Sequence, residues 1–178
     1  MAQMRDETGL DKNAANFVAL TPLSHLKRAS YIFPDRLAVA YGTQHRKTYA
    51  EYHARVSALA SALSRAGVQP GDVVATLLPN IPAHCEAHFA VPATGAVLNA
   101  INTRLDIETI RYIFEHGEAK MALVDTEFLP SVEAAIAAMD GKGPQIVEVA
   151  DPSHGHPATG RYPEYEAFLA GGDAAFKW

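Results

Sequence analysis

The sequence predicts an α/β fold in which an N-terminal β-hairpin and helices lead into a Rossmann-like parallel sheet with helices on both faces. Short apolar runs alternate with segments of helical periodicity along most of the chain. In the central stretch 73–105, the apolar runs 73–78 and 97–101 flank a segment rich in small residues, which indicates a strand, a crossover helix and a second strand. Because both runs are continuous, we expect both strands to be buried on two faces.

The composition is that of an ordinary globular chain and excludes several classes of function. The 178 residues are 48% hydrophobic and 20% charged, with a net charge of −5. This balance argues against nucleic-acid binding, because no block of Lys and Arg is present to neutralise phosphates. The single cysteine, Cys85, cannot form an internal disulfide, which suits a reducing compartment. The N-terminus is unlike a signal peptide and no apolar run is long enough for a membrane span, so we expect a cytoplasmic protein.

The N-terminal third contains signals for a helix and a hairpin. Residues 1–16 are polar and are predicted to be loose. Pro22 suits the first turn of a short helix, and Pro34 ends it. The runs 37–41 and 45–49 flank a three-residue turn that begins with glycine, which predicts a β-hairpin.

The strongest helix signal follows this hairpin. Thr48 and Glu51 have the spacing of a capping box, in which each side chain satisfies a free amide of the first turn. Apolar residues then recur at helical spacing, and Gly67 suits the left-handed residue that follows the helix. In the central crossover helix, Pro92 removes a backbone donor, so we expect a kink or an early stop there.

The second half of the chain continues the alternation of helices and strands. Asp106 is a suitable N-cap for a helix, and Gly117 suits its end. After the last strand, a segment rich in Pro, Gly, Ser and His predicts a surface loop. The elements expected are a helix at 107–116, a strand at 121–124, a helix at 128–139 closed by Gly141 and Gly143, a strand at 145–149, a loop at 151–160 and a short helix at 162–169.

The sequence contains no glycine-rich phosphate loop. Neither G-x-G-x-x-G after a strand nor G-x-x-x-x-G-K-[ST] occurs, which disfavours a dinucleotide-binding protein. The predicted strands are followed by Asn80, Asn102 and Asp125. Because ligands of parallel sheets bind beyond the carboxyl ends of the strands, we expect any ligand of this sheet near these three positions.

The other residues with reactive side chains do not form a complete active site. His84 and His88 share a helix face and have the spacing to chelate a metal, although such a pair beside an apolar stripe more often has no metal. We expect Cys85 to be a small buried apolar group rather than a nucleophile. We expect His154 and His156 to face solvent from their loop. No pair of carboxylates stands out as an acid/base couple.

Five blocks of sequence occur in an order and separation typical of one family. They are PDRLAVAYG (34–42), the long segment 47–80, the region 86–89, GAVLNAINTRLDIETIRYIF (95–114) and ALVD (122–125). Together they resemble the N-terminal part of the AMP-forming acyl-CoA synthetases, members of the adenylate-forming superfamily. The resemblance covers residues 17–177, and the general likeness is greatest to medium-chain or methylmercaptopropionate-type CoA ligases.

The resemblance implies an ATP-dependent acid–CoA ligase. Members of the family use Mg²⁺ and ATP to convert a carboxylic acid into an acyl-adenylate and pyrophosphate, and CoA then displaces AMP to give a thioester. The phosphate loop, the ribose-binding Asp and the catalytic Lys of the family match nothing in this chain. The resemblance therefore implies a partial subdomain of a larger adenylate-forming lobe that is inactive alone. It contains no catalytic residue and is not expected to bind ATP, Mg²⁺ or CoA by itself.

In some members of the family, the loop after the second strand of the central stretch helps to hold CoA. Here that loop contains Asn102 and Arg104 and lacks the glycines of those members, and both residues are candidates for the CoA side. A solvated charge is the simpler interpretation of Arg104. The resemblance also allows a homodimer.

The resemblance also predicts how the chain is divided. We expect a loose N-terminus (1–16), an α/β subdomain of the large lobe (17–150), and a loop and short helix (151–178) that lead to a remainder outside this chain. A non-catalytic α/β interaction or dimerisation module is an alternative from another class of function.

Overall fold

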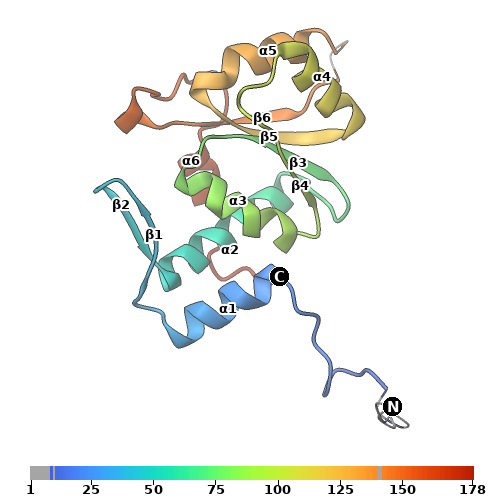
Figure 1. Ribbon diagram of the computed structural model, residues 1–178, viewed down its shortest axis with the longest axis vertical. Coiled ribbons are helices and arrows are strands. Elements are labelled where there is room, and N and C mark those ends of the chain that lie inside the picture. Colours follow the sequence, from blue (N-terminus) through green and yellow to red (C-terminus); the bar gives the residue numbers. More distant parts are fainter. Residues whose placement is uncertain (1–8, 10, 140–141) are drawn as a thin grey trace, which may run out of the picture.

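The computed structural model describes residues 9, 11–139 and 142–178, and its centre is a parallel sheet between two layers of helices (Figure 1). The strands lie in the order β4-β3-β5-β6, and each neighbouring pair is parallel. They are β3 (Val73–Leu77), β4 (Val97–Ala100), β5 (Ala119–Asp125) and β6 (Gln145–Val149). The predicted α/β sheet with helices on both faces is confirmed.

Successive residues of the strands face two separate cores. Val74 and Leu123 pack with α2 and α3 on one side of the sheet, whereas Leu77 and Val124 pack with α4 and α5 on the other. The outer helices α1 and α6 pack against α2. The helices are α1 (Pro22–Ile32), α2 (Tyr49–Arg65), α3 (Pro82–Ala93), α4 (Ile107–His116), α5 (Leu129–Ala137) and α6 (Tyr165–Ala170).

The expectation that both central strands are buried on two faces is right for β3 and wrong for β4. β3 has a hydrogen-bonded neighbour on each side and is buried along nearly its whole length. β4 lies at the edge of the sheet, and Val97 at its start is 54% exposed. An apolar run is compatible with either place, because strand order depends on contacts distant in sequence.

The predicted hairpin and helix starts are confirmed. β1 (Leu37–Tyr41) and β2 (His45–Thr48) pair antiparallel, and α2 follows directly. The Thr48 amide donates to Glu51 Oε2 at 2.7 Å, and Thr48 Oγ1 accepts from the Glu51 amide at 3.3 Å. Asp106 Oδ1 accepts from the amide of Thr109 at 2.9 Å and caps α4.

Gly117 follows the last residue of α4, as predicted, but for a different physical reason. Its φ is −82°, and the left-handed residue is Glu118 with φ +48°. A Cβ on Gly117 would lie 2.9 Å from the carbonyl oxygen of Ile113 and 3.2 Å from Asn99 Nδ2. The glycine is therefore required by close packing rather than by a positive φ.

Several helices begin or end a few residues away from their predicted positions. α3 ends at Ala93, one residue after Pro92, which fits the expected early stop. The helix predicted at 128–139 is a 3₁₀ turn, η1 (Thr126–Phe128), followed by α5, and Gly141 lies outside the described residues. α6 begins three residues later than predicted, where Glu164 caps it. Within the described residues, no helix combines the length and apolar character needed to cross a membrane.

Candidate functional site

The carboxyl ends of the four parallel strands form the edge of the sheet where a ligand is expected. β3 continues through α3 to β4 on one side, whereas β5 continues through α5 to β6 on the other. The direction of the connections therefore reverses between β3 and β5, and this is where ligands of open parallel sheets bind. Asp125 ends β5 there and is fully buried, whereas Asn80 and Asn102 are exposed.

The two residues predicted for the CoA side lie in an exposed turn after β4. Asn102 Oδ1 accepts a hydrogen bond from the Arg104 amide at 2.9 Å, which shapes the turn. Both side chains are exposed, and neither lines the cavity described next. Their role toward CoA stays a prediction.

A cavity of about 460 Å³ lies beyond the end of β6. The hairpin, α2, the start of α3, the segment after β6 and α6 supply its walls. It contains more carboxylates than cations, so its lining does not fit a triphosphate. The cations of the lining are Lys47 and Arg55, and its carboxylates are Glu86, Asp151, Glu164 and Glu166.

An ion-pair network at one wall of the cavity connects three helices. Arg55 of α2 contacts Glu86 of α3, with Nε 2.5 Å from Oε1, and Glu166 of α6, with Nη2 2.7 Å from Oε1. The Tyr165 hydroxyl donates to Glu86 Oε2 at 2.5 Å. Burial opposes the charge of Arg55, but its hydrogen bonds with the two carboxylates raise its pKa. Burial and the neighbouring Glu86 raise the pKa of Tyr165 well above its usual value.

A second cluster lies where the hairpin meets the segment after β6. The Tyr41 hydroxyl donates to Asp151 Oδ2 at 2.7 Å, and Ser153 Oγ donates to Asp151 Oδ1 at 2.5 Å. His154 Nδ1 lies 3.0 Å from Asp151 Oδ2. The residue types match a Ser-His-Asp triad, but the geometry does not. Ser153 Oγ and Asp151 Oδ2 face the same ring nitrogen, Nδ1 of His154, at 3.1 and 3.0 Å, whereas a triad histidine contacts its serine and its aspartate through different nitrogens. Burial, and then Asp151, raise the pKa of Tyr41 to about 12.

The segment 151–160 is tied to β6 and also pairs with itself, so it is not a free loop. The buried Glu148 of β6 accepts hydrogen bonds from the amides of Thr159 at 3.0 Å and Gly160 at 2.9 Å. Asp151 and His156 form two backbone hydrogen bonds with each other, of 2.7 and 3.0 Å. These contacts hold His156 close to the end of β5.

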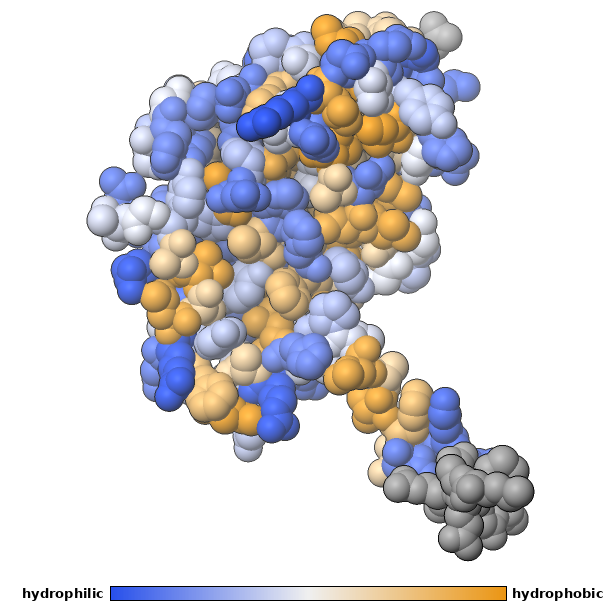
Figure 2. All heavy atoms as spheres, viewed as in Figure 1, coloured by the Kyte–Doolittle hydropathy of each residue, from blue (hydrophilic) through white to orange (hydrophobic). Residues whose placement is uncertain are grey.

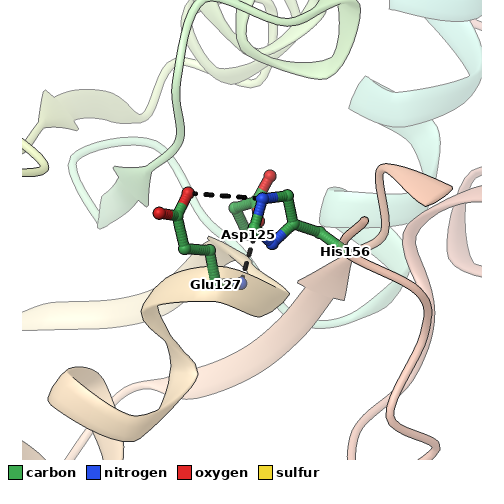
Figure 3. Close-up of side chains that lie close together, drawn as sticks. All are labelled: Asp125, Glu127 and His156. Atoms are coloured by element: carbon green, nitrogen blue, oxygen red, sulfur yellow. Dashed lines mark hydrogen bonds and ion pairs between the residues drawn. The ribbon is translucent and has the colours of Figure 1, made fainter. Parts of the chain in front are cut away.

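The prediction that both loop histidines face solvent is wrong for His156 and incomplete for His154. The His156 side chain is 29% exposed, and its Nε2 lies 3.7 Å from Glu127 Oε2, next to Asp125 (Figure 3). His154 is exposed but is held by the contacts to Asp151 described above. The turns that bring these histidines to carboxylates depend on Glu148 and on backbone pairing, which the composition of the loop did not reveal.

The pair His84 and His88 lies side by side on α3, as predicted from its spacing. Both ring nitrogens of His84 already face protein atoms, with Nε2 3.3 Å from Thr76 Oγ1 and Nδ1 3.3 Å from the carbonyl oxygen of Pro79. Among the described residues, no third histidine, cysteine or carboxylate completes a metal site with this pair. Burial, and then the neighbouring His88, lower the pKa of His84.

Cys85 is exposed, so the expectation that it is buried is wrong. Partial desolvation, and then the charge of the adjacent Glu86, raise the pKa of its thiol, which disfavours a nucleophilic thiolate.

The sequence around Glu86 contains a signal for the ion-pair network, although it matches no motif. Ala83, Glu86, Ala87 and Ala90 lie on one buried stripe of α3. A charged residue in the middle of such a stripe indicates a buried pair, because an unpaired buried charge is very costly.

Known proteins match most of the chain in sequence. A family model described as AMP-binding enzyme matches residues 26–166. The acetate–CoA ligase CCL3 of Humulus lupulus is 42% identical over 98% of this chain and 32% of its own length. The peroxisomal butyrate–CoA ligase AAE11 of Arabidopsis thaliana is 48% identical over 68% of this chain and 21% of its own. The chain thus spans about a third or less of the length of these relatives.

Solved structures share the fold. The anthranilate CoA ligase AuaEII in complex with anthranoyl-AMP has a TM-score of 0.75 at 21% identity, over 87% of this chain and 28% of that one. The fatty acyl CoA synthetase of Mycobacterium tuberculosis has a TM-score of 0.70 at 24% identity, over 85% of this chain and 28% of that one. These likenesses concern the fold, whereas the family model matches well over half of the sequence. The chain belongs to the family of AMP-binding enzymes.

Proposed function

We propose that this chain is part of an AMP-forming carboxylic acid–CoA ligase. The enzyme activates an acid with ATP to give an acyl-adenylate and pyrophosphate, and then forms the CoA thioester. The observation that carries the proposal is the 42% identity to an acetate–CoA ligase over 98% of the chain. Agreement in fold with two CoA-dependent ligases supports it.

The described residues support a structural rather than a nucleotide-binding role for this part of the enzyme. In the cavity, Arg55 is already paired with two carboxylates, which leaves it poorly suited to a phosphate. The chain also lacks a phosphate loop. We therefore propose that ATP and Mg²⁺ are held by residues outside this chain, and that the chain alone forms no adenylate.

The turn after β4, which contains Asn102 and Arg104, is the one place where we propose that this chain contacts a substrate, CoA, directly. Arg104 is an exposed guanidinium beyond the carboxyl end of β4, and such a group suits a phosphate of CoA. In the complete enzyme, Arg104→Ala should raise the KM for CoA and leave the KM for ATP unchanged. The matched control is Arg28→Ala on the exposed side of α1, which should change neither.

The acid is proposed to be of short or medium chain length. Relatives that match this chain are named as ligases of acetate and butyrate. The likeness to medium-chain and methylmercaptopropionate-type ligases stays a prediction. The native protein should be isolated and tested for thioester formation with acetate, butyrate, octanoate and 3-(methylthio)propionate. Thioester formation with none of these acids, in the presence of ATP, Mg²⁺ and CoA, would contradict the proposal.

A role in subunit contact has its own supporting observation. Exposed apolar side chains gather on the segment before α1 and around α1, where Figure 2 shows hydrophobic residues at the surface. Such a surface is usually covered by another part of the protein or by a second copy. The residues are Phe17, Val18, Leu20, Tyr31, Ile32, Phe33 and Leu37. Light scattering on the native protein tests the proposed homodimer, and a monomeric mass would contradict it.

The cytoplasmic location stays a prediction. One of the relatives named above, the butyrate–CoA ligase AAE11, carries the word peroxisomal in its name. Microscopy of a fluorescent fusion of the native protein distinguishes the two compartments.

A further inference from the structure

Three residues from two segments meet at the place in the sheet where ligands are expected. Asp125 ends β5, Glu127 lies in the turn η1 that follows, and His156 comes from the segment after β6 (Figure 3). One ligand atom from each side chain lies within 4.8 Å of the others. We propose that Asp125, Glu127 and His156 bind a divalent cation of the Zn²⁺ class. This inference does not depend on the ligase proposal.

The strongest support is an unsatisfied oxygen on a fully buried carboxylate. Asp125 is 0% exposed, and its Oδ1 accepts a hydrogen bond from the Glu127 amide at 2.9 Å. Its Oδ2 has no hydrogen-bond partner within the described part of the chain. Leaving such an oxygen unpaired inside a protein costs free energy. A bound cation would remove this cost.

The histidine is held in position for binding. Two backbone hydrogen bonds between Asp151 and His156 fix its main chain, and Glu148 anchors the same segment further along. His156 Nε2 and Glu127 Oε2 are 3.7 Å apart, which is too far for a hydrogen bond. In a tetrahedral zinc site, ligand atoms lie about 3.4 Å apart, because each is roughly 2.1 Å from the metal. Because the Glu127 side chain is half-exposed, a small rotation would shorten its 3.7 Å separation from His156 toward this spacing.

The donor set selects the class of metal. One imidazole nitrogen and two carboxylate oxygens suit zinc and similar transition metals better than Mg²⁺, which favours oxygen ligands and retains several waters. Three protein ligands leave a fourth position open for water or an anionic oxygen. The ion would connect the end of β5 to the segment that follows β6.

The test is a titration of the metal-free 178-residue chain with Zn²⁺ in competition with a chromophoric chelator. We expect one Zn²⁺ per chain at this site, with binding weakened at least about tenfold by His156→Asn and by Glu127→Gln. Glu127 is exposed, so Glu127→Gln should leave the circular dichroism spectrum unchanged and separates loss of binding from loss of folding.

The matched controls are His88→Asn, which removes the other histidine pair, and His25→Asn on the exposed side of α1. Both should bind Zn²⁺ as the unmodified chain does. With Co²⁺ as a second probe, visible absorption of the bound ion should be lost in His156→Asn and kept in His88→Asn. No binding by the unmodified chain, unchanged binding in His156→Asn, or loss of binding in His88→Asn would each overturn the proposal.

Discussion

The hydroxyl of Tyr165 donates a 2.5 Å hydrogen bond to Glu86 Oε2, and this contact joins α6 to α3 across 79 residues of sequence. Both residues are buried, and Arg55 of α2 contacts the same carboxylate. The contact therefore holds three helices together at one wall of the cavity. Helix α6 is short, so its position depends on such contacts more than on its own helical stability.

We expect Tyr165→Phe to destabilise the chain by about 2 kcal/mol, because a buried hydrogen bond to a charged group is lost and the ring is kept. Urea unfolding followed by circular dichroism measures the change. Tyr112→Phe is the matched control, since Tyr112 is exposed on α4. Equal effects of the two substitutions would contradict a stabilising role for the contact between Tyr165 and Glu86.

The two carboxylates that contact Arg55 should contribute unequally. Glu86→Gln should cost about 3 kcal/mol, because it weakens a pair whose acidic member is almost fully buried. Glu166→Gln should cost less than about 1 kcal/mol, because the Glu166 side chain is 61% exposed. Urea unfolding of the two variants compares these two costs. A larger effect at Glu166 would mean that the exposed pair is the one that positions the helices.

The contribution of the α2 capping box to the free energy of unfolding should be measurable on its own. Thr48→Ala removes the acceptor for the Glu51 amide and should lower the free energy of unfolding by about 1 kcal/mol. Thr43→Ala, in the exposed turn of the hairpin, is the control and should have little effect. An unchanged midpoint of unfolding in Thr48→Ala would show that the cap does not contribute.

The buried carboxyl of Asp125 should give the stability of the metal-free chain a characteristic dependence on pH. Burial raises its pKa, against the opposing effects of the Glu127 amide and His156. The folded chain thus holds this proton more tightly than the unfolded chain, in which the pKa is about 3.9. Ionised Asp125 therefore disfavours folding, and its cost grows as the pH rises from about 4 through the raised pKa.

Asp125→Asn removes this cost and keeps an oxygen that accepts from the Glu127 amide. In the presence of a chelator, we expect the free energy of unfolding of Asp125→Asn to improve, relative to the unmodified chain, between pH 4 and pH 7. Asp35→Asn, at an exposed side chain, should show no such trend. A relative loss of stability toward pH 7 would mean that ionised Asp125 is stabilised in the fold.

Local signals were sufficient to predict much of the fold. The capping boxes and N-caps at Thr48 and Asp106 depend on residues three positions apart, so the sequence reveals them directly. The position of β4 at the edge of the sheet was not predictable in this way, because it depends on which strands pair. The close approach of Ile113 and Asn99 to Gly117 likewise arises only after the helix has packed.

The candidate site could be predicted only in part. The strand ends indicated Asp125, because parallel strands end at a common edge. His156 was missed because backbone pairing with Asp151 and the anchor at Glu148 decide its direction. The contact of Arg55 with Glu86 crosses 31 residues, and only the charge of Glu86 within an alanine stripe indicated it.

The most direct test of the proposed ligase function is acid-dependent exchange of pyrophosphate into ATP, measured for the isolated 178-residue chain and for the native protein that carries this sequence. We expect exchange by the native protein with a short- or medium-chain acid, and none by the isolated chain. We also expect a native mass roughly three times 19.1 kDa, because the chain spans 32% of the acetate–CoA ligase. Exchange by the isolated chain, or no exchange by the native protein, would contradict the proposal.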